Sequence, residues 1–147
     1  AVPVVLAAIT SENDIAAVTG RTYNISTSGF DFELDEQQAD KTTDHQSESI
    51  SYIAWESSIG EINGKSFEVG RTLNEVTHDF YYIPFSQSLT STPVFVAEAQ
   101  TRNGKDIANV RWQAKDVYGV EVMIDEEESK DAETIHTYEV VGYLVIE

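Results

Sequence analysis

An internal repeat is the feature that most constrains how this chain folds. Residues 3–39 align with residues 93–129 at an offset of 90, and residues 40–56 align with residues 131–147 at an offset of 91. Eight identical positions precede the single inserted residue and six follow it, so 14 of the 54 aligned positions are identical. Ordered self-similarity of this kind is the signature of a duplicated structural unit. We infer that one sheet-forming unit occurs twice.

Both copies have the composition of β-strands. Val, Ile, Thr, Tyr and Phe are frequent, and Gly and Asn separate the candidate strands. Residues 29–34 alternate apolar and acidic side chains, which is typical of a strand with one buried face. Since no segment keeps a 3.6-residue period, the sequence predicts an all-β protein: an antiparallel β-sandwich built from two related units, with almost no helix. The expected strands of the first copy are residues 3–10, 15–25, 29–35 and 48–56.

The segment before the second copy has no counterpart in the first. Residues 57–92 include two strand-like stretches, 66–69 and 80–85, and predict one or two further strands. Residues 57–147 then form a complete unit, and residues 1–56 form the same unit without its opening strand. A missing strand leaves an open sheet edge. Either another chain pairs with this edge, which gives a homo-oligomer, or the two copies share strands, or the sequence is cut from a longer chain.

The composition excludes several classes of partner. The 147 residues contain 26 Asp and Glu but only 9 Lys and Arg, which gives a formal net charge of −17. Nucleic acids and anionic membranes attract cationic faces, so we expect neither as a partner. There is no cysteine, which excludes disulfides and thiolate metal sites. An even acidic coat is common in saline habitats, where salt screens the repulsion. The apolar residues 1–10 lack a basic stretch, so we expect no signal peptide there.

One set of polar residues recurs in both copies. Carboxylates accept hydrogen bonds from sugar hydroxyls and histidine can donate or accept them, so one interpretation is a small sugar site in each unit. A second is Ca²⁺, for which Asp35, Glu36 and Asp40 could supply some oxygen ligands; otherwise we expect no cofactor. The third is structural, with His45 paired to Glu48 at the start of the last strand. The recurring residues are Asp35, Glu36, Asp40, His45 and Glu48 in the first copy, and Asp125, Glu126, Asp131, His136 and Glu139 in the second.

The aromatic residues divide into a candidate platform and a candidate core. Sugar-binding modules often stack the apolar face of a sugar on an exposed ring, and Trp112, followed by Tyr118 at the next turn, is the favoured platform. Tyr81 is a further candidate. The alternative is that rings fill the core, and we expect this for Phe32, Tyr52 and Tyr143, and also for Trp55. His78 is expected to stabilise a turn.

Catalysis is not expected. Glycoside hydrolysis needs two carboxyl groups across a cleft, and a unit of about 90 residues offers little room for one. No G-x-S-x-G nucleophile elbow is present. The H-x-x-E pairs precede a strand, where side chains three residues apart are expected on opposite faces. That spacing argues against a shared metal.

The second unit resembles the H-type lectin domain and related bacterial repeat modules. The resemblance rests on Val76-Thr77-His78, Ile83, Phe85, Pro93-Val94-Phe95, Arg111, Gly119, Tyr143 and Glu147. It covers residues 57–147 fully and 3–56 in part. In that family a small antiparallel β-sandwich binds galactose-type sugars and often forms trimers. The resemblance implies a non-catalytic carbohydrate-binding module of a secreted or cell-surface protein, which binds a galactose-type or other neutral polysaccharide. The alternative is a structural or assembly repeat of a large surface protein with no small ligand.

Overall fold

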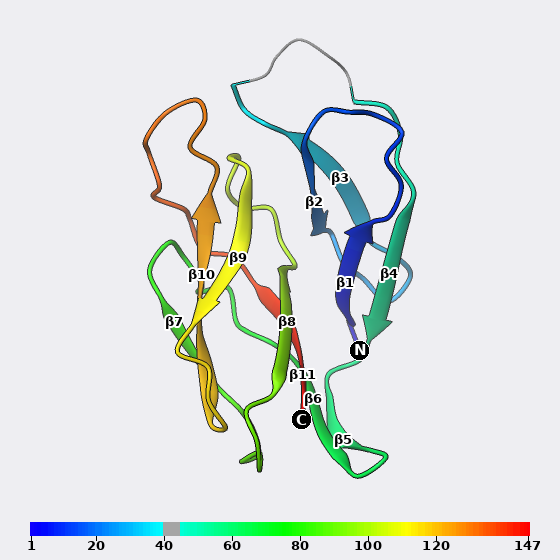
Figure 1. Cartoon of the computed structure of the whole chain (residues 1–147), viewed down its shortest axis with the longest axis vertical. Helices are drawn as coiled ribbons and strands as arrows, with labels where there is room; N and C mark the ends of the chain where they lie inside the picture. The colour runs from blue at the N-terminus through cyan, green and yellow to red at the C-terminus, as the bar shows by residue number, and fades with distance from the viewer. Residues whose placement is uncertain (40–44) are drawn as a thin grey trace.

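The computed structural model describes residues 1–39 and 45–147, and these residues contain strands but no helix. Every strand pairing is antiparallel, which confirms the predicted fold class (Figure 1). The strands are β1 Val4–Ile9, β2 Val18–Tyr23, β3 Asp31–Glu36, β4 Ile50–Trp55, β5 Ser58–Ile62, β6 Lys65–Arg71, β7 Tyr81–Pro84, β8 Val94–Ala99, β9 Ala108–Gln113, β10 Gly119–Glu126 and β11 Val141–Ile146.

Residues 57–147 form a sandwich of two sheets. One sheet has the strand order β5-β6-β11-β8, and the other has the order β7-β10-β9. Alternate residues of β10, among them Val122 and Ile124, pack with Val141 and Val145 of β11 in one buried cluster. Because successive side chains of a strand point to opposite faces, this period-2 burial places the core between the two sheets.

Residues 1–56 form two antiparallel strand pairs, β1-β4 and β2-β3. In β1-β4, Val4 lies opposite Trp55, and their repeat equivalents Val94 and Ile146 lie opposite each other in β8-β11. The pairs β2-β3 and β9-β10 also share their register at an offset of 90. The two halves of the sequence alignment therefore correspond strand by strand in the structure.

The segment between the copies contains three strands, β5, β6 and β7, where the sequence predicted one or two. The strand that was missed is β5, which pairs with β6 through the turn at Asn63 and Gly64. Both turn residues have positive φ, of 52° and 77°. An Asn-Gly pair with two positive φ angles is the preferred two-residue hairpin turn. This local signal was present in the sequence and predicts the extra strand.

The first unit packs on the outer face of the second unit's larger sheet. Val4 of β1 joins Phe67 and Val69 of β6 in a second buried cluster, against which Leu6 and Trp55 also pack. The Trp55 and Phe67 rings lie 5.1 Å apart between centroids. Trp55 is thus partly buried, as expected, but in this second cluster and not in a core of its own unit.

The turns after β2 and β9 share an unusual backbone conformation. Asn24 has a φ of 50°, and Ala114, which is 90 residues further along, has a φ of 46°. Asn tolerates the left-handed region because its side chain bonds locally, whereas the Cβ of Ala is crowded there. The fold thus imposes the same turn on both copies although only the first has a residue suited to it.

Replacing Ala114 with Gly is expected to stabilise the protein by about 1 kcal/mol, because the left-handed conformation costs Gly no steric strain. Urea unfolding monitored by circular dichroism measures this change. Ala54→Gly in β4 serves as the control, and it should lower the free energy of unfolding because Gly weakens a strand interior. A loss of stability in Ala114→Gly would contradict the strained turn.

Candidate functional site

The recurring histidine of the second unit lies in a buried cluster with two carboxylates. His136 precedes β11, with its Nδ1 against the Glu126 carboxylate and its Nε2 3.0 Å from Glu139 Oε1. His136 and Glu139 are fully buried and Glu126 nearly so. The expectation that the H-x-x-E side chains point to opposite faces is wrong, because the two side chains meet, and residues 136–139 lie before β11, outside the regular strand.

Glu139 is the centre of this cluster. Its Oε1 accepts hydrogen bonds from the Asn103 and Gly104 backbone amides at 2.9 and 3.0 Å, and its Oε2 accepts one from the Thr101 hydroxyl. Arg21 Nη2, from β2 of the other unit, donates to Oε1 at 2.6 Å. Both side chains of this ion pair are buried, so it joins the two units where water cannot screen it.

The electrostatics of the cluster favour the charged forms of His136 and Glu139. Burial alone would lower the pKa of His136, but hydrogen bonds to Glu139 and Glu126 outweigh burial and raise it above 6.5. Burial alone would raise the pKa of Glu139, but hydrogen bonds from His136, Thr101 and the Gly104 amide, with the charge of Arg21, lower it below 4.5. The two directions agree: each partner stabilises the charged form of the other.

The first unit contains the equivalent cluster. His45 Nε2 lies 3.2 Å from Glu48 Oε1, and its Nδ1 lies 3.7 Å from Glu36. Glu48 accepts the Asn13 amide at 2.8 Å and the Ser11 hydroxyl. In the repeat alignment Ser11 corresponds to Thr101 and Asn13 to Asn103. The residues that donate to Glu48 and Glu139 are therefore aligned in the two copies, and the motif search for recurring charged residues missed them.

The remaining acidic candidates have separate positions. Asp35 is nearly buried and accepts from Arg102 Nη2 at 2.8 Å. Asp125 lies on the surface, where Arg111 Nε donates to it at 3.1 Å. The structure therefore does not bring the acidic pairs of the two units into one shared site.

The described residues do not provide a complete set of oxygen ligands for the calcium site that the sequence suggested. Asp40 lies outside the described residues, and Asp35 is already paired with Arg102. Elsewhere in the described part of the chain, carboxylate oxygens of Asp106, Glu126 and Glu133 lie within 4.8 Å of one another. An acidic cluster alone is not a metal site, and calcium binding stays a prediction.

The burial of both His–Glu clusters favours the structural interpretation. The side chains of His45, Glu48, His136 and Glu139 are at most 5% exposed. Each cluster connects the loop after the first strand of its copy to the start of the last strand, and a ligand in solution does not reach these atoms without local opening. A ligand-binding role for them remains a prediction.

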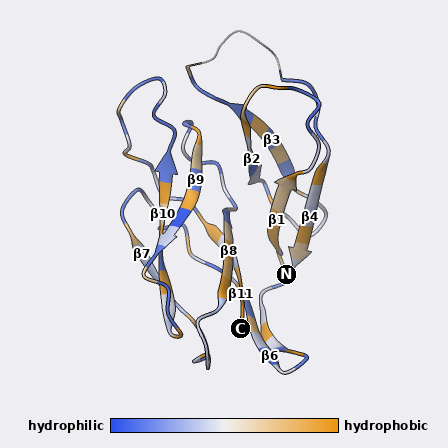
Figure 2. Ribbon diagram, in the orientation of Figure 1, coloured by the Kyte–Doolittle hydropathy of each residue, from blue (hydrophilic) through white to orange (hydrophobic). Residues whose placement is uncertain are grey.

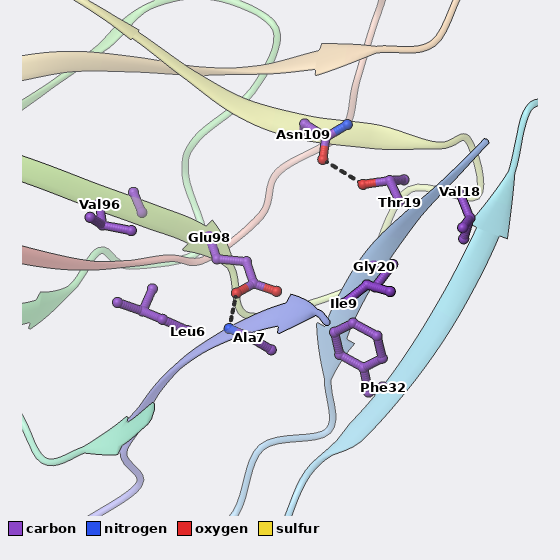
Figure 3. Close-up of a pocket in the computed structure, with 11 residues that line it drawn as sticks. Leu6, Ala7, Ile9, Val18, Thr19, Gly20, Phe32, Val96, Glu98 and Asn109 are labelled. Carbon is purple, nitrogen blue, oxygen red and sulfur yellow. Dashed lines mark hydrogen bonds between the residues drawn. The ribbon is translucent and has the colours of Figure 1, made fainter. Parts of the chain in front are cut away.

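A polar pocket of about 340 Å³ lies between the units, lined by residues of β1, β2, β3, β8 and β9 (Figure 3). Glu98 accepts the Ala7 amide at 2.7 Å and the Thr22 hydroxyl at 2.8 Å, both from the first unit. Thr19 donates to Asn109, its repeat equivalent, at 2.9 Å. Burial raises the pKa of Glu98, although these hydrogen bonds oppose the shift. The pocket is thus part of the junction that holds the units together.

The aromatic candidates differ in exposure. Trp112 is 50% exposed and lies under the Lys115 ammonium, which is 4.6 Å from its ring centroid. Tyr118, in the turn between β9 and β10, is 61% exposed. Tyr81 is partly buried and donates to Glu75 at 2.7 Å. His78 faces the His136 carbonyl at 3.2 Å, in agreement with a turn-stabilising role.

Comparison with known proteins gives one informative match. The chain is 31% identical over 134 residues to Halomucin of Haloquadratum walsbyi (strain DSM 16790 / HBSQ001). The alignment covers 90% of this chain, which spans only about 1% of the length of Halomucin. No protein-family profile matches the chain. No solved structure matches it either. Within the described residues, no helix is long and apolar enough to cross a membrane.

Glu139→Gln is expected to destabilise the protein by about 3 kcal/mol, because it leaves the buried Arg21 charge without its partner. Glu128→Gln, at an exposed position, is the matched control and should change the free energy of unfolding by less than about 0.5 kcal/mol. Chemical denaturation of the three proteins measures both effects. Equal stabilities would show that the buried ion pair does not hold the units together.

The cluster also predicts how stability depends on pH. The raised pKa of His136 gives a contribution that is complete below 6.5 and is lost as the pH rises through the folded-state pKa. The lowered pKa of Glu139 gives a contribution that is complete above 4.5 and is lost as the pH falls. Together they are largest between these two values.

His136→Gln should therefore flatten the decline in the free energy of unfolding as the pH rises above 6.5. Urea titrations at several pH values test this expectation, with the partly exposed His78→Gln as the control that keeps the decline. An unchanged pH profile in His136→Gln would remove the cluster as its source.

Proposed function

We propose that this chain is a structural module of a long extracellular protein, in which such units follow one another along the chain. The observation that carries this proposal is the register-matched pair of units joined through the buried Arg21–Glu139 contact. A duplicated sheet unit whose interfaces lie between neighbouring copies is how linear repeat proteins build length. The similarity to a small segment of Halomucin, by name a mucin, supports the same role.

The surface charge fits a saline extracellular setting. A formal charge of −17 on 147 residues produces self-repulsion that keeps the chain soluble but opposes its compact state. Molar salt shortens the Debye length to about 3 Å and removes most of this repulsion. The proposed location and the composition therefore support each other.

Labelling of intact cells tests the proposed location. An antibody against this module should bind unpermeabilised cells that produce the parent protein, and external protease should remove the signal. An antibody against an intracellular protein is the control for leakage. A signal that appears only after lysis would overturn the extracellular assignment.

Raising NaCl from about 0.1 M to about 2 M is expected to raise the melting temperature by more than about 5 °C, because screening relieves the acidic repulsion. Scanning calorimetry measures the shift. A variant in which the exposed Glu12, Glu61, Asp79 and Glu128 are amides should show a smaller shift. An equal shift in both proteins would mean that the effect comes from salting-out and not from charge.

Carbohydrate binding is the second candidate function. The half-exposed Trp112, with Lys115 over its ring and Tyr118 in the adjoining turn, is the observation that favours it. An exposed indole offers an apolar face on which a sugar can stack, and the H-type lectin resemblance independently points to a galactose-type ligand. The charge of −17 disfavours sulfated and uronic polymers, so neutral galactose-type polysaccharides are the proposed ligands.

Pull-down on neutral galactans tests this second function. The chain should be retained, and Trp112→Ala should reduce the affinity about tenfold by removing the stacking face. Tyr82→Ala removes another exposed ring, on β7, and should leave retention unchanged. Failure to bind any neutral galactan would dismiss sugar binding and leave the structural role intact.

A further inference from the structure

The first unit has two strand edges that its counterpart covers. In the complete unit, β11 lies between β6 and β8, and β10 lies between β7 and β9. The equivalent strands of the first unit, β4 and β3, each pair with one strand only, β1 and β2 respectively, within the described residues. The sheet positions that correspond to β6 and β7 are thus open beside β4 and β3.

The first unit is exposed along β4 and only partly buried along β3, whereas Val5 of β1 and Thr22 of β2 are fully buried against the second unit. Tyr143 on β11 is 7% exposed, whereas its equivalent Tyr52 on β4 is 60% exposed. Val122 on β10 is fully buried, whereas its equivalent Phe32 on β3 is only partly buried. The sequence prediction that Tyr52 lies in a core is wrong, because no described strand lies beside β4 in the position that β6 occupies beside β11.

The hydropathy of β4 also sets the first unit apart from the second. β4 carries hydrophobic stretches near both ends with a paler stretch between them, although it lies at the edge of its sheet (Figure 2). The rings of Phe30 and Tyr52 meet edge to face, 4.9 Å apart, and form the start of a core. An edge strand with an exposed apolar face is a site for pairing with another segment.

The complete unit shows what such a segment needs. Within residues 57–92, Val76, Ile83 and Leu89 are buried in the sandwich core. Glu68 of β6 accepts the Tyr143 hydroxyl at 2.8 Å. Gly70 lies beside the same ring, where a Cβ would approach the hydroxyl oxygen to 2.3 Å. The cover therefore combines apolar residues with an acceptor and a glycine placed for a tyrosine.

We propose that β3 and β4 of the first unit are covered by a β5-β6-β7-type segment of a neighbouring repeat in the same long protein. The inference rests on the proposed function as a repeat module. A segment of this type reaches both sheets at once, pairing with β4 and β3 and filling the core between them. A single strand donated by a second copy would cover only one edge, so the continuous segment is the occupant that fits.

The register of the missing pairing follows from the complete unit. Val69 of β6 lies opposite Leu144 of β11, and the repeat equivalent of Leu144 is Ile53. The incoming residue that corresponds to Val69 should therefore lie opposite Ile53, and the one that corresponds to Gly70 should lie opposite Tyr52. These pairs can be tested directly because the chain contains no cysteine.

A fusion tests the proposal. A second copy of residues 57–90 is placed directly before Ala1, which restores the offset of 90 between the copies. Hydrogen exchange of the β3 and β4 amides should slow at least tenfold, and the melting temperature should rise. The matched control carries Val76→Asp, Ile83→Asp and Leu89→Asp in the added copy alone, and there the β3 and β4 exchange should stay as in the original chain.

Cysteine pairing gives a readout that does not depend on stability. Ile53→Cys should form a disulfide with Val69→Cys of the added copy under mild oxidation, since residues directly opposite in an antiparallel pair have Cα atoms about 4.5 to 5.5 Å apart. Asn63→Cys, in the hairpin turn of the added copy, should not react. A fused protein with normal protection in β8–β11, but with unchanged β3 and β4 exchange and no selective disulfide, would overturn the proposal. Cell-surface labelling is independent of this result, so the two failures are distinguishable.

Discussion

The ion pair between Arg21 and Glu139 is the contact on which the arrangement of the two units depends. Two charges without water are costly unless their remaining hydrogen-bonding capacity is satisfied, and here it is. Glu139 also receives His136, a hydroxyl and two backbone amides, while the Arg21 Nε and Nη1 groups lie within 3.4 Å of the Thr101 and Asp106 carbonyls. Such a network fixes the angle at which the units meet, because few other arrangements bond all of its members.

Several smaller contacts around that pair complete the junction. The Gln100 side chain bonds both the amide and the carbonyl of Val5 at 2.8 Å, which imitates one rung of a β-ladder. Glu98 bonds the Ala7 amide in the same way. The polar side chains of Glu98 in β8 and of Gln100 directly after it thus satisfy the free edge of β1. Direct strand pairing between the units is not needed, and each unit keeps its own sheets.

The sequence predicted the parts of this structure that depend on local pattern. Alternation and the 90-residue offset gave the fold class and the strands of the first copy, because burial on one face of a strand has a period of two. The Arg21–Glu139 pair was not predictable, since nothing in the neighbourhood of either residue marks it for a partner 118 positions away. Tyr52 shows a second feature that the sequence could not predict, namely how exposed a residue on a predicted strand is. Its pattern predicted a core position, yet Tyr52 is 60% exposed, because burial depends on neighbouring segments that a strand pattern does not specify.

Acidic residues lie along the partly exposed strand β3. On β3 the exposed Asp31 and Glu33 alternate with apolar residues; Glu33 is paired with Arg102, and the Asp31 carboxylate beside the open strand disfavours pairing with another copy of itself. By contrast β7, which occupies the corresponding edge in the complete unit, has the uncharged sequence Tyr81–Pro84. A β7-type strand, which has no charged residue, would meet no such repulsion beside β3. Charge thus opposes promiscuous edge pairing and permits pairing with the segment whose shape and polarity the complete unit displays.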